Sequence, residues 1–569
     1  MPKYGQADRP IAVTTPLGKD VLLLAGFRGH ETISQLFTFQ LDFLAESTAD
    51  IAFDKILGQS VTVETRLINN EKRYLNGIVK RFSQGGRDDL DFIRYQGELV
   101  PKIWLLTKTV RSRTFQHITV PDILKKVFQG YDVSYEIHSI FRPRDYCVQY
   151  RESDFDFASR LMEEEGIYFF FKHTASGHQM VVTDHSTPVL PGQSTLIYEE
   201  LTGGVRDEQR VLSWEKSQEL RSGEYTLWDH NFELPTKNLE AKQKTVETVT
   251  VGKVLHKLKV GGNDKLEVYE YPGGFAGRFD GIDRGGGPQP AEIQHIFEDS
   301  ARTVKIRMEQ ETVAGLEIRG KSNCGQLSAG FKFTLTRHFN ADGPYLLTRV
   351  EHDARLGGNY RSDAVLPFRY ENQFICLPAA LRYRPQRLTR TPVIPGTQTA
   401  TVVGPAGQEI FVDRYGRVKV QFHWDREGKK DAASSCWVRV AQFWAGKGWG
   451  AFFWPRIGHE VVVMFEDGDP DQPLIVGSVY NAENLPYFTL PAMKKFAGIK
   501  SSTTDGNAQE NFNGIVLVDE DGKEHMALHS ERHMVINAEY DISYTTGRHH
   551  AERVPGARTQ TVGRLPGTS

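Results

Sequence analysis

The segment from residue 413 to residue 481 constrains the fold more than any other part of the chain, because several strand patterns follow one another within it. Residues 417–424 read RVKVQFHW, and the apolar letters alternate with the polar ones. This period of two predicts a half-buried β-strand. Three further strand patterns, separated by Gly-rich or Asp/Pro-rich turns, lie at residues 437–443, 450–454 and 460–465. Short antiparallel strands in such close succession predict a small closed barrel of the OB type.

The same segment resembles a known family, and so do three segments far upstream. The matching sequences are DRYGRVKVQFHWDREGK from Asp413, WVRVAQFWAGKGWGAFFWPRIGHEVVV from Trp437 and FEDGDPDQPLIVGSVYN from Phe465. Upstream they are YLNGIVKRF from Tyr74, PKIWLLTKTVRSRTFQ from Pro101 and CVQYRESDFDFASRLMEEEGIYFFF from Cys147. At these positions the chain is similar to VgrG, the spike protein of bacterial type VI secretion, and the similarity extends over roughly residues 15–550.

Length and composition indicate a multidomain globular protein. A chain of 569 residues is long enough for about three to four domains. Its content of 39% hydrophobic and 11% aromatic residues supports packed cores and excludes disorder throughout. The formal net charge of -3 argues against a general polyanion binder, since nucleic-acid-binding domains usually carry a clear basic excess.

The N-terminal sequence predicts a protein that starts in the cytoplasm. Its apolar run, residues 21–25, is too short and too late for a signal peptide, and no run approaches the length of a membrane span. The cysteines Cys147, Cys324, Cys376 and Cys436 lie far apart without a CxxC pair, so reduced and packed thiols are expected.

Two helices are expected after a strand-rich region that runs to about residue 109 and predicts a first β-barrel. Thr119 with Asp122 forms a capping box for the first helix, and Ser153 with Asp156 opens a second one that ends at Gly166. On the second helix, the side chains at positions 157 and 161 are expected to face inward.

A third helix is expected from residue 291 to about residue 310, and it should close over a second barrel. The residues expected on its apolar face are Ile293, Phe297, Ala301, Val304 and Met308.

The expected fold class is mainly β with some α. A Pro-rich segment that contains PQRLTRTPVIP predicts a domain boundary. The expected division is a phage-hub-like region of two β-barrels with helical segments (1–384), a linker (385–397), the OB domain (398–482), a connector (483–511) and the start of a trimeric β-prism (512–569).

The C-terminal segment predicts strands that one chain cannot cover. IVLVDEDGKEHMALHS predicts two strands around an Asp521-Gly522 turn. Farther on, the expected alternating apolar face is formed by Met534, Ile536, Ala538, Tyr540, Ile542 and Tyr544. No helix pattern follows that could cover this face, and open edges invite aggregation. Three copies wrapped into a prism would bury it, and the chain would hold only the start of such a needle.

The resemblance implies a mechanical function. VgrG proteins are homotrimers in which a hub caps the hexameric Hcp tube and an intertwined β-prism carries a PAAR-type tip. The implied partners also include effector and adaptor proteins, baseplate components and, transiently on firing, the target membrane. The protein would assemble in the cytoplasm and leave through the type VI machine. No catalytic residue, cofactor, metal or nucleic acid is expected.

Three alternatives stay open. The chain could be the spike of a phage-like contractile tail, or a VgrG whose effector enzyme lies beyond Ser569. A remote alternative is an OB-type protein that binds single-stranded nucleic acid, because aromatic and basic side chains share the OB strands. The side chains that favour it are Arg417, Lys419, His423, Trp437 and Arg439.

The structural or interface candidates in the OB domain are Trp424, Trp437, Trp444 and Trp454.

Two motifs match phosphate or calcium sites by letters alone. Residues 315–322, GLEIRGKS, satisfy the P-loop pattern, but Leu316 and Ile318 alternate as in a strand, whereas a phosphate cradle leads into a helix. Asp467, Asp469 and Asp471 have the spacing of calcium-loop ligands, but the rest of that loop is missing. A strand and a solvated turn are therefore expected at these two places.

Other candidate sites also fail on context. His525, His529 and His533 read as strand residues, which would set neighbours roughly 13 Å apart, so one ion cannot bridge them within one chain. In a trimer each histidine would meet its symmetry mates, which leaves a threefold metal site open. The glycines from 446 to 450 are expected to permit tight turns beside tryptophans. The carboxylates of residues 163–165 are expected to form a solvated face.

Overall fold

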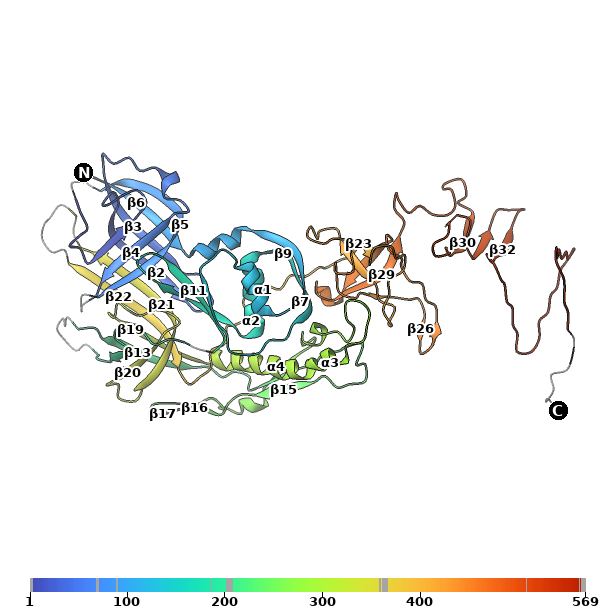
Figure 1. The fold of residues 1–569 in the computed structure, drawn as a ribbon. Coiled ribbons are helices and arrows are strands. Elements are labelled where there is room, and N and C mark those ends of the chain that lie inside the picture. Colours follow the sequence, from blue (N-terminus) through green and yellow to red (C-terminus); the bar gives the residue numbers. More distant parts are fainter. Residues whose placement is uncertain are drawn as a thin grey trace. The chain divides into compact units, whose positions relative to one another are not determined.

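The computed structural model describes residues 4–67, 71–88, 91–185, 187–200, 208–357, 360, 367–507, 509–561 and 563. The chain divides into two compact units, Met1–Val479 and Tyr480–Ser569. The first unit is mainly β with a few helices, as expected from the sequence (Figure 1).

A large mixed sheet dominates the first unit. Among the described residues it has twelve strands, and its continuous path runs β1-β4-β5-β6-β3-β2-β21-β22-β19-β13, with β12 and β20 attached at β21. The bounds are β1 (Ile11–Thr14), β2 (Leu23–Thr32), β3 (Thr38–Glu46), β4 (Ser60–Arg66), β5 (Lys72–Asp88), β6 (Phe92–Val100), β12 (Thr195–Ile197), β13 (Val211–Gln218), β19 (Leu316–Ser322), β20 (Lys332–Thr336), β21 (Gly343–Leu356) and β22 (Phe368–Pro378).

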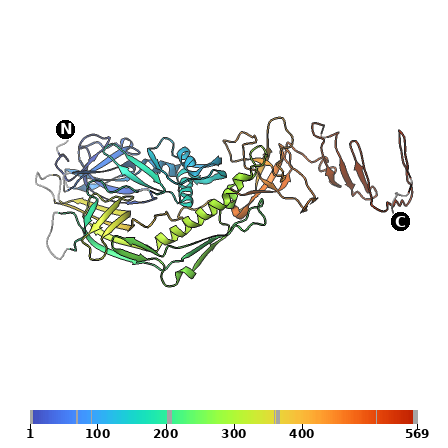
Figure 2. The same ribbon diagram turned by 60° about the horizontal axis from the view of Figure 1, so that its bottom comes forward.

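The antiparallel pairing of β2 with β21 joins the N-terminal strands to the later ones. The two expected hub barrels are therefore two halves of one sheet in this chain, and strands far apart in sequence lie side by side in it (Figure 2).

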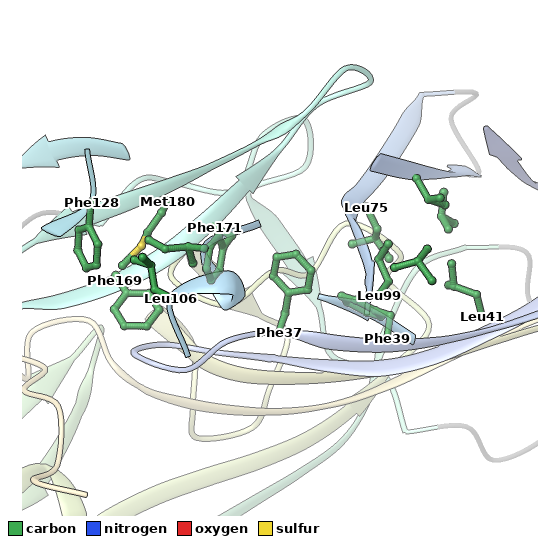
Figure 3. Packing of buried hydrophobic residues seen from close by; sticks show 14 of the residues in the cluster. Phe37, Phe39, Leu41, Leu75, Leu99, Leu106, Phe128, Phe169, Phe171 and Met180 are labelled. Atoms are coloured by element: carbon green, nitrogen blue, oxygen red, sulfur yellow. The ribbon is translucent and has the colours of Figure 1, made fainter. Parts of the chain in front are cut away.

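An aromatic-rich core packs against the N-terminal half of the sheet. Phe37 contacts Phe171, which lies on the strand Tyr168–His173, with ring centroids 5.0 Å apart, and Phe39 and Leu41 extend the same cluster toward the sheet (Figure 3). Complete burial of one such side chain stabilises the fold by roughly 1.5 to 3 kcal/mol. A second cluster, with Phe333, Tyr345 and Phe374 among its members, packs against the C-terminal half.

Helices α1 (Val120–Val127) and α2 (Asp154–Glu165) begin where the sequence predicts. Thr119 Oγ1 accepts a hydrogen bond from the amide of Asp122 (3.2 Å), and Ser153 Oγ accepts one from the amide of Asp156 (3.0 Å). Gly166 ends α2 with a left-handed backbone (φ 67°), a conformation that costs glycine little. Phe157 and Leu161 are buried, as expected.

The third helical segment contains α3 (Pro290–Ile293) and α4 (His295–Ala314). Ile293, Val304 and Met308 are buried, but Phe297 is 43% exposed and Ala301 is also exposed, so this part of the expected apolar face is wrong. The buried face of α4 instead includes Asp299, Thr303, Arg307 and Gln310. An apolar pattern cannot locate a helix face that is buried through ion pairs and hydrogen bonds.

Smaller sheets and short helices complete the region before the linker. The strands are β7 (Val110–Ile118) with β9 (Arg144–Ser153); β8 (Val133–Glu136), β10 (Tyr168–His173) and β11 (His178–Thr183); β14 (Glu224–Leu227), β15 (Ala241–Lys244) and β18 (Glu267–Glu270); and β16 (Thr248–Val251) with β17 (Val254–Lys257). The short 3-10 helices are η1 (Phe53–Lys55), η2 (Lys102–Lys108), η3 (Asn263–Lys265) and η4 (Ala276–Arg278).

The OB region contains a five-stranded sheet in the order β24-β23-β28-β29-β25. Its strands are β23 (Gln398–Val403), β24 (Lys419–Phe422), β25 (Arg439–Val440), β28 (Glu460–Phe465) and β29 (Pro473–Val479), with η5 (Glu466–Gly468) between the last two. The expected strand at 460–465 is confirmed. The strands expected at 437–443 and 450–454 are too long, because pairing there is limited to a bridge between Val438 and Val418, to β25 and to a hairpin of β26 (Ala445–Gly446) with β27 (Trp449–Gly450).

Strand β24 is buried on both faces, so the half-buried strand predicted from RVKVQFHW is wrong. Val420 and Phe422 lie in the OB core, and the polar Lys419 and Gln421 are buried as well. Preceding the strand, Arg417 is also buried, because its charge meets carboxylates from the loop before β24 and from the hub.

The second unit contains a three-stranded sheet of β30 (Phe496–Lys500), β31 (Gly514–Val518) and β32 (His525–His529). The expected hairpin around Asp521-Gly522 is confirmed, with Gly522 at φ 74°. The alternating segment 534–544 is not a strand in the described residues, contrary to expectation. A strand forms only where another strand supplies hydrogen-bond partners.

Candidate assembly surface

The C-terminal sheet carries an ordered row of exposed apolar side chains. Strand register places Ile499 opposite Ile515, and Ile515 opposite Leu528. A neighbouring row on the same face aligns Leu517 with Met526. All five side chains are exposed. Contiguous exposed apolar surface of this kind marks an interaction site in natural proteins.

The sequence-predicted residues beyond this sheet are also exposed. Exposure of Met534, Ile536, Tyr540, Ile542 and Tyr544 ranges from 49% at Ile542 to 96% at Tyr540. One copy of the chain therefore leaves the whole alternating apolar set in contact with solvent.

An aromatic hairpin projects from the OB region. Its turn contains Gly448 at φ 79°, and Gly450 at φ 133° allows the backbone to pass close to Trp444. The rings of Trp444 and Trp449 meet edge to face at 5.0 Å, yet they remain 60% and 59% exposed. Other exposed aromatic residues in this segment are Phe443, Phe452, Phe453 and Trp454.

The other two candidate tryptophans have internal roles. Trp437 is buried, its ring lies tilted against that of Phe411 with the centroids 4.8 Å apart, and its indole N–H donates to the carbonyl of Asp283 (2.7 Å). Trp424 is half-buried, and its indole N–H donates to Gln398 Oε1 (3.0 Å). Of the four candidate tryptophans, two are therefore internal and two are exposed. The alternation of apolar and polar residues in the sequence did not reveal this difference.

A buried ion-pair joint connects the OB region to the hub. Arg417 donates to both carboxylate oxygens of Asp280 (2.6 and 2.9 Å), and its Nε donates to Asp413 (2.6 Å). Lys419 beside it donates to the carbonyl of Ser435 (3.1 Å). Asp280 and Asp413 thus balance the buried charge of Arg417, whereas Lys419 has a neutral hydrogen-bond partner and burial lowers its pKa.

Asp145 of β9 adds a titratable group to this joint. Its carboxylate lies 3.5 Å from Nδ1 of His117. Burial and the Asp280 carboxylate raise the pKa of Asp145 to about 7, although Lys419 and Arg417 favour the charged form.

Hub and OB region also share an apolar core. Tyr146 and Val148 of β9 pack in one cluster with Val420, Phe422 and Val463 of the OB strands. The amide of Val148 donates to Asp471 Oδ1 (2.6 Å). The expected solvated turn at residues 467–471 is therefore only partly solvated, because Asp471 docks on β9 while Asp467 stays exposed.

The solvated face expected for residues 163–165 is wrong. Glu165 forms ion pairs with Arg144 and Arg302, and Glu164 pairs with Arg144 at 3.0 Å. Burial alone would raise the pKa of Glu164, but Arg144 and Arg160 lower it to about 2. These ion pairs stabilise the packing of α2 against α4.

Glu163 anchors the linker that leads to the OB region. Its carboxylate accepts hydrogen bonds from the backbone amides of Leu388 and Thr389 (both 3.0 Å) and from Thr389 Oγ1 (2.8 Å). A carboxylate near the end of α2 thus fixes a segment more than two hundred residues later, a contact that no local signal could predict.

The P-loop-like motif forms a strand, as predicted. GLEIRGKS forms β19 after α4, in the opposite order to a phosphate-binding strand and helix. The described residues contain no group of three or more His, Cys, Asp or Glu side chains that could hold a metal ion within this chain. Every helix in the described part of the chain is too short or too polar to span a membrane.

The aromatic hairpin and the C-terminal rows contain functional candidates that sequence reasoning missed. Phe443, Phe452 and Phe453 sit in the run QFWAGKGWGAFFW, whose density of aromatic residues around glycines was a usable signal. Ile499 could have been found only by pairing its strand with the next one.

Family models match two regions of the chain. The phage tail baseplate hub (GPD) model matches residues 30–358. The type VI secretion system/phage-baseplate injector OB domain model matches residues 411–480.

Curated relatives match nearly the whole chain. The type VI secretion system spike protein VgrG1c of Pseudomonas aeruginosa is 36% identical over 565 residues, which cover 97% of this chain and 72% of the relative. VgrG1b of the same bacterium is 35% identical, with coverage of 96% and 71%. The actin cross-linking toxin VgrG1 of Vibrio cholerae is 31% identical, with coverage of 91% and 45%.

Solved structures share the fold. The Escherichia coli c3393 protein, described as a type VI secretion component similar to the T4 bacteriophage tail proteins gp27 and gp5, aligns with a TM-score of 0.54 at 20% identity. That alignment covers 82% of this chain and 99% of the other. The half-lidded Francisella PdpA-VgrG complex aligns with a TM-score of 0.52 at 9% identity, covering 91% and 88%.

Proposed function

This chain belongs to the VgrG family of type VI secretion system spike proteins, and on that premise we propose that it works as a structural homotrimer. In this proposal three copies assemble through the C-terminal segment and the aromatic hairpin. We assign residues 1–384 to the hub, 385–397 to a linker, 398–482 to the OB domain, 483–511 to a connector and 512–569 to the start of a β-prism.

The observation that carries the proposal is the uncovered apolar surface of the second unit. Ile499, Ile515 and Leu528 form an exposed row, and Tyr540 and Ile542 continue the apolar surface along the chain. Monomeric proteins rarely leave such surface in water. Strands contributed by two further copies would bury it and would supply the hydrogen-bond partners that segment 534–544 lacks in one chain.

The internal construction suits the transmission of force. A shared apolar core and the Arg417–Asp280 ion pair connect the hub to the OB region, and Glu163 fastens the linker beside them. A push on the hub would therefore reach the OB region through packed contacts rather than through a free linker. We infer that the protein acts mechanically and not as an enzyme.

The proposed partners follow from the family. They are an Hcp tube below the hub, a PAAR-type tip, effector and adaptor proteins, baseplate components and, on firing, the target membrane. The Francisella relative is described in a complex with PdpA, which supports carriage of a second protein. We propose assembly in the cytoplasm and delivery through the secretion machine without a signal peptide.

Substitutions on the two faces of the C-terminal segment test the proposal. Ile536→Asp with Tyr540→Asp and Ile542→Asp places charges on the face proposed to be buried. The matched control places the same charges on the other face, as Val535→Asp with Asn537→Asp and Ser543→Asp. Sedimentation should show loss of trimer only for the first variant. Equal trimer content in both variants would contradict the proposed interface.

A further inference from the structure

A polar trough lies on the large sheet of the hub, across the junction of its two halves. The trough is open to solvent, has a volume of about 1030 Å³ and is lined by strands β2, β3, β5, β6, β13, β19, β21 and β22. In Figure 1 the blue strand β2, with β3 and then β6 beyond it, lies beside the yellow strand β21, which β22 follows. The apolar surfaces considered above lie in other parts of the chain, so this trough is a separate feature.

Strand register builds the trough from two rows of polar side chains. One row crosses six strands as Arg81, Glu98, Gln40, Arg28, Asp353 and Glu371. The second crosses six strands as Thr38, His30, Glu351, Gln373, Lys321 and Ser213. Each row thus places charged side chains among neutral hydrogen-bonding ones along a continuous path.

The carboxylates of these rows are already neutralised. Their ion pairs are Glu98 with Lys80 (2.6 Å), Glu351 with Arg349 (2.6 Å), Asp353 with Arg355 (2.8 Å) and Glu371 with Arg369 (2.9 Å). Because each carboxylate is paired with a cation, the charges of these pairs cancel. The remaining cations therefore set the net charge of the trough.

Three cations in the rows have no carboxylate partner within the described residues. Arg28 donates to the neutral Gln40 Oε1 (2.8 and 3.1 Å), and Arg81 and Lys321 form no ion pair there. All three side chains are exposed. Burial lowers the pKa of His30, so this histidine adds hydrogen-bonding capacity but no charge at neutral pH.

We propose that this trough docks an extended acidic segment of a partner protein. The three free cations would attract its carboxylates, and side chains such as Gln40, Gln96 and Gln373 would hydrogen-bond its backbone. A nucleic acid fits less well, because it carries a phosphate at every nucleotide, whereas paired carboxylates separate the free cations of the trough. The inference goes beyond the trimer proposed above and does not depend on it.

Binding of an acidic peptide tests the proposal. The probe is a short fluorescein-labelled peptide of alternating glutamate and serine, titrated with the full chain at low salt by fluorescence anisotropy. Arg28→Gln with Arg81→Gln and Lys321→Gln should weaken binding about tenfold, since three partly solvated charge pairs are lost. All three positions are exposed, so folding should survive, which thermal unfolding monitored by circular dichroism verifies.

A charge-matched control separates a specific trough from general attraction. Arg426→Gln with Lys429→Gln and Lys430→Gln removes three exposed cations from the OB region, outside the aromatic hairpin. This variant should bind the peptide within about twofold of the unmodified chain. Equal weakening in both triple variants, no binding by the unmodified chain, or tighter binding of a labelled oligothymidylate would each overturn the proposal.

Light scattering in the same buffer distinguishes failure of the trough proposal from failure of the trimer proposal. Absent peptide binding by a chain of trimeric mass would overturn the trough and leave the proposed function standing. Peptide binding by a monomeric chain, lost in the Arg28, Arg81 and Lys321 variant, would support the trough while contradicting the trimer.

Discussion

Arg417 of the OB region donates two hydrogen bonds, of 2.6 and 2.9 Å, to Asp280 of the hub. Both side chains are almost fully buried. The two residues are 137 positions apart in the sequence. This ion pair and the shared apolar core connect the hub to the OB region.

Asp280→Asn should destabilise the chain strongly. The substitution preserves shape but leaves the buried Arg417 with Asp413 as its one carboxylate partner among the described residues, and breaking a buried pair from one side costs about 3 kcal/mol or more. Urea unfolding followed by tryptophan fluorescence measures the change. Adding Arg417→Met to Asp280→Asn should recover part of the loss. A change below about 1 kcal/mol in the single variant would show that the pair does not hold the joint.

Asp145→Asn should change how stability depends on pH. The native pKa of Asp145 is about 7, above its ordinary value of 3.8, so the native state binds this proton more tightly than the unfolded state. The stability contributed by the protonated carboxyl is complete below pH 3.8 and is lost as pH rises toward 7. Asparagine mimics the protonated form, so the variant should gain roughly 2 kcal/mol relative to the unmodified chain between pH 5 and pH 8.

Urea unfolding at a series of pH values checks the Asp145 prediction. Lys419, Arg417 and Arg284 favour the charged form, whereas Asp280 opposes it, so Asp280→Asn should reduce the effect. A stability difference that stays constant from pH 5 to pH 8 would show that Asp145 titrates normally.

Glu163→Ala should release the linker without unfolding the hub. The variant loses the three hydrogen bonds to Leu388 and Thr389, so trypsin should cut sooner after Arg387 and Arg390. Glu427→Ala removes an exposed carboxylate elsewhere and serves as the control. Mass spectrometry of timed digests identifies the first cut. Identical cleavage rates in both variants would mean that these hydrogen bonds do not restrain the linker.

Trp437→Ala should mainly lower the stability of the fold, whereas Trp444→Ala should mainly lower the fraction of trimer. Trp437 is buried, so its truncation should lower the free energy of unfolding by about 3 to 5 kcal/mol. Trp444 is exposed, and its truncation should change this free energy by less than about 0.5 kcal/mol while lowering the fraction of trimer. Urea unfolding and sedimentation supply the two readouts. Reversed effects would contradict the division between internal and exposed tryptophans.

Local signals predicted local structure well. The capping pairs at Thr119 and Ser153 placed two helix starts, and Asp521-Gly522 placed a hairpin. These features depend on contacts between residues close in sequence, so the sequence alone reveals them.

Burial of charged groups was the main error. Arg417, Lys419 and Glu165 all read as solvated from their patterns, but each is buried against partners that are distant in the chain or on another element. An alternating pattern assumes that the polar side faces water. It cannot show that another domain will supply the opposite charge.

The interface candidates illustrate a different limit. Trp437 and Trp444 lie seven positions apart in one aromatic run, and only the structure shows that one is internal and the other exposed. Segment 534–544 has a clear strand pattern, but it forms no strand within the described part of a single chain. Its place in a trimer stays a prediction.

The absolute mass in solution, measured by multi-angle light scattering, tests the trimer most directly. One chain has a mass of 64.4 kDa, so a homotrimer should have three times that value, about 193 kDa, across a range of protein concentrations. A mass near 64.4 kDa at every concentration would contradict the homotrimeric spike.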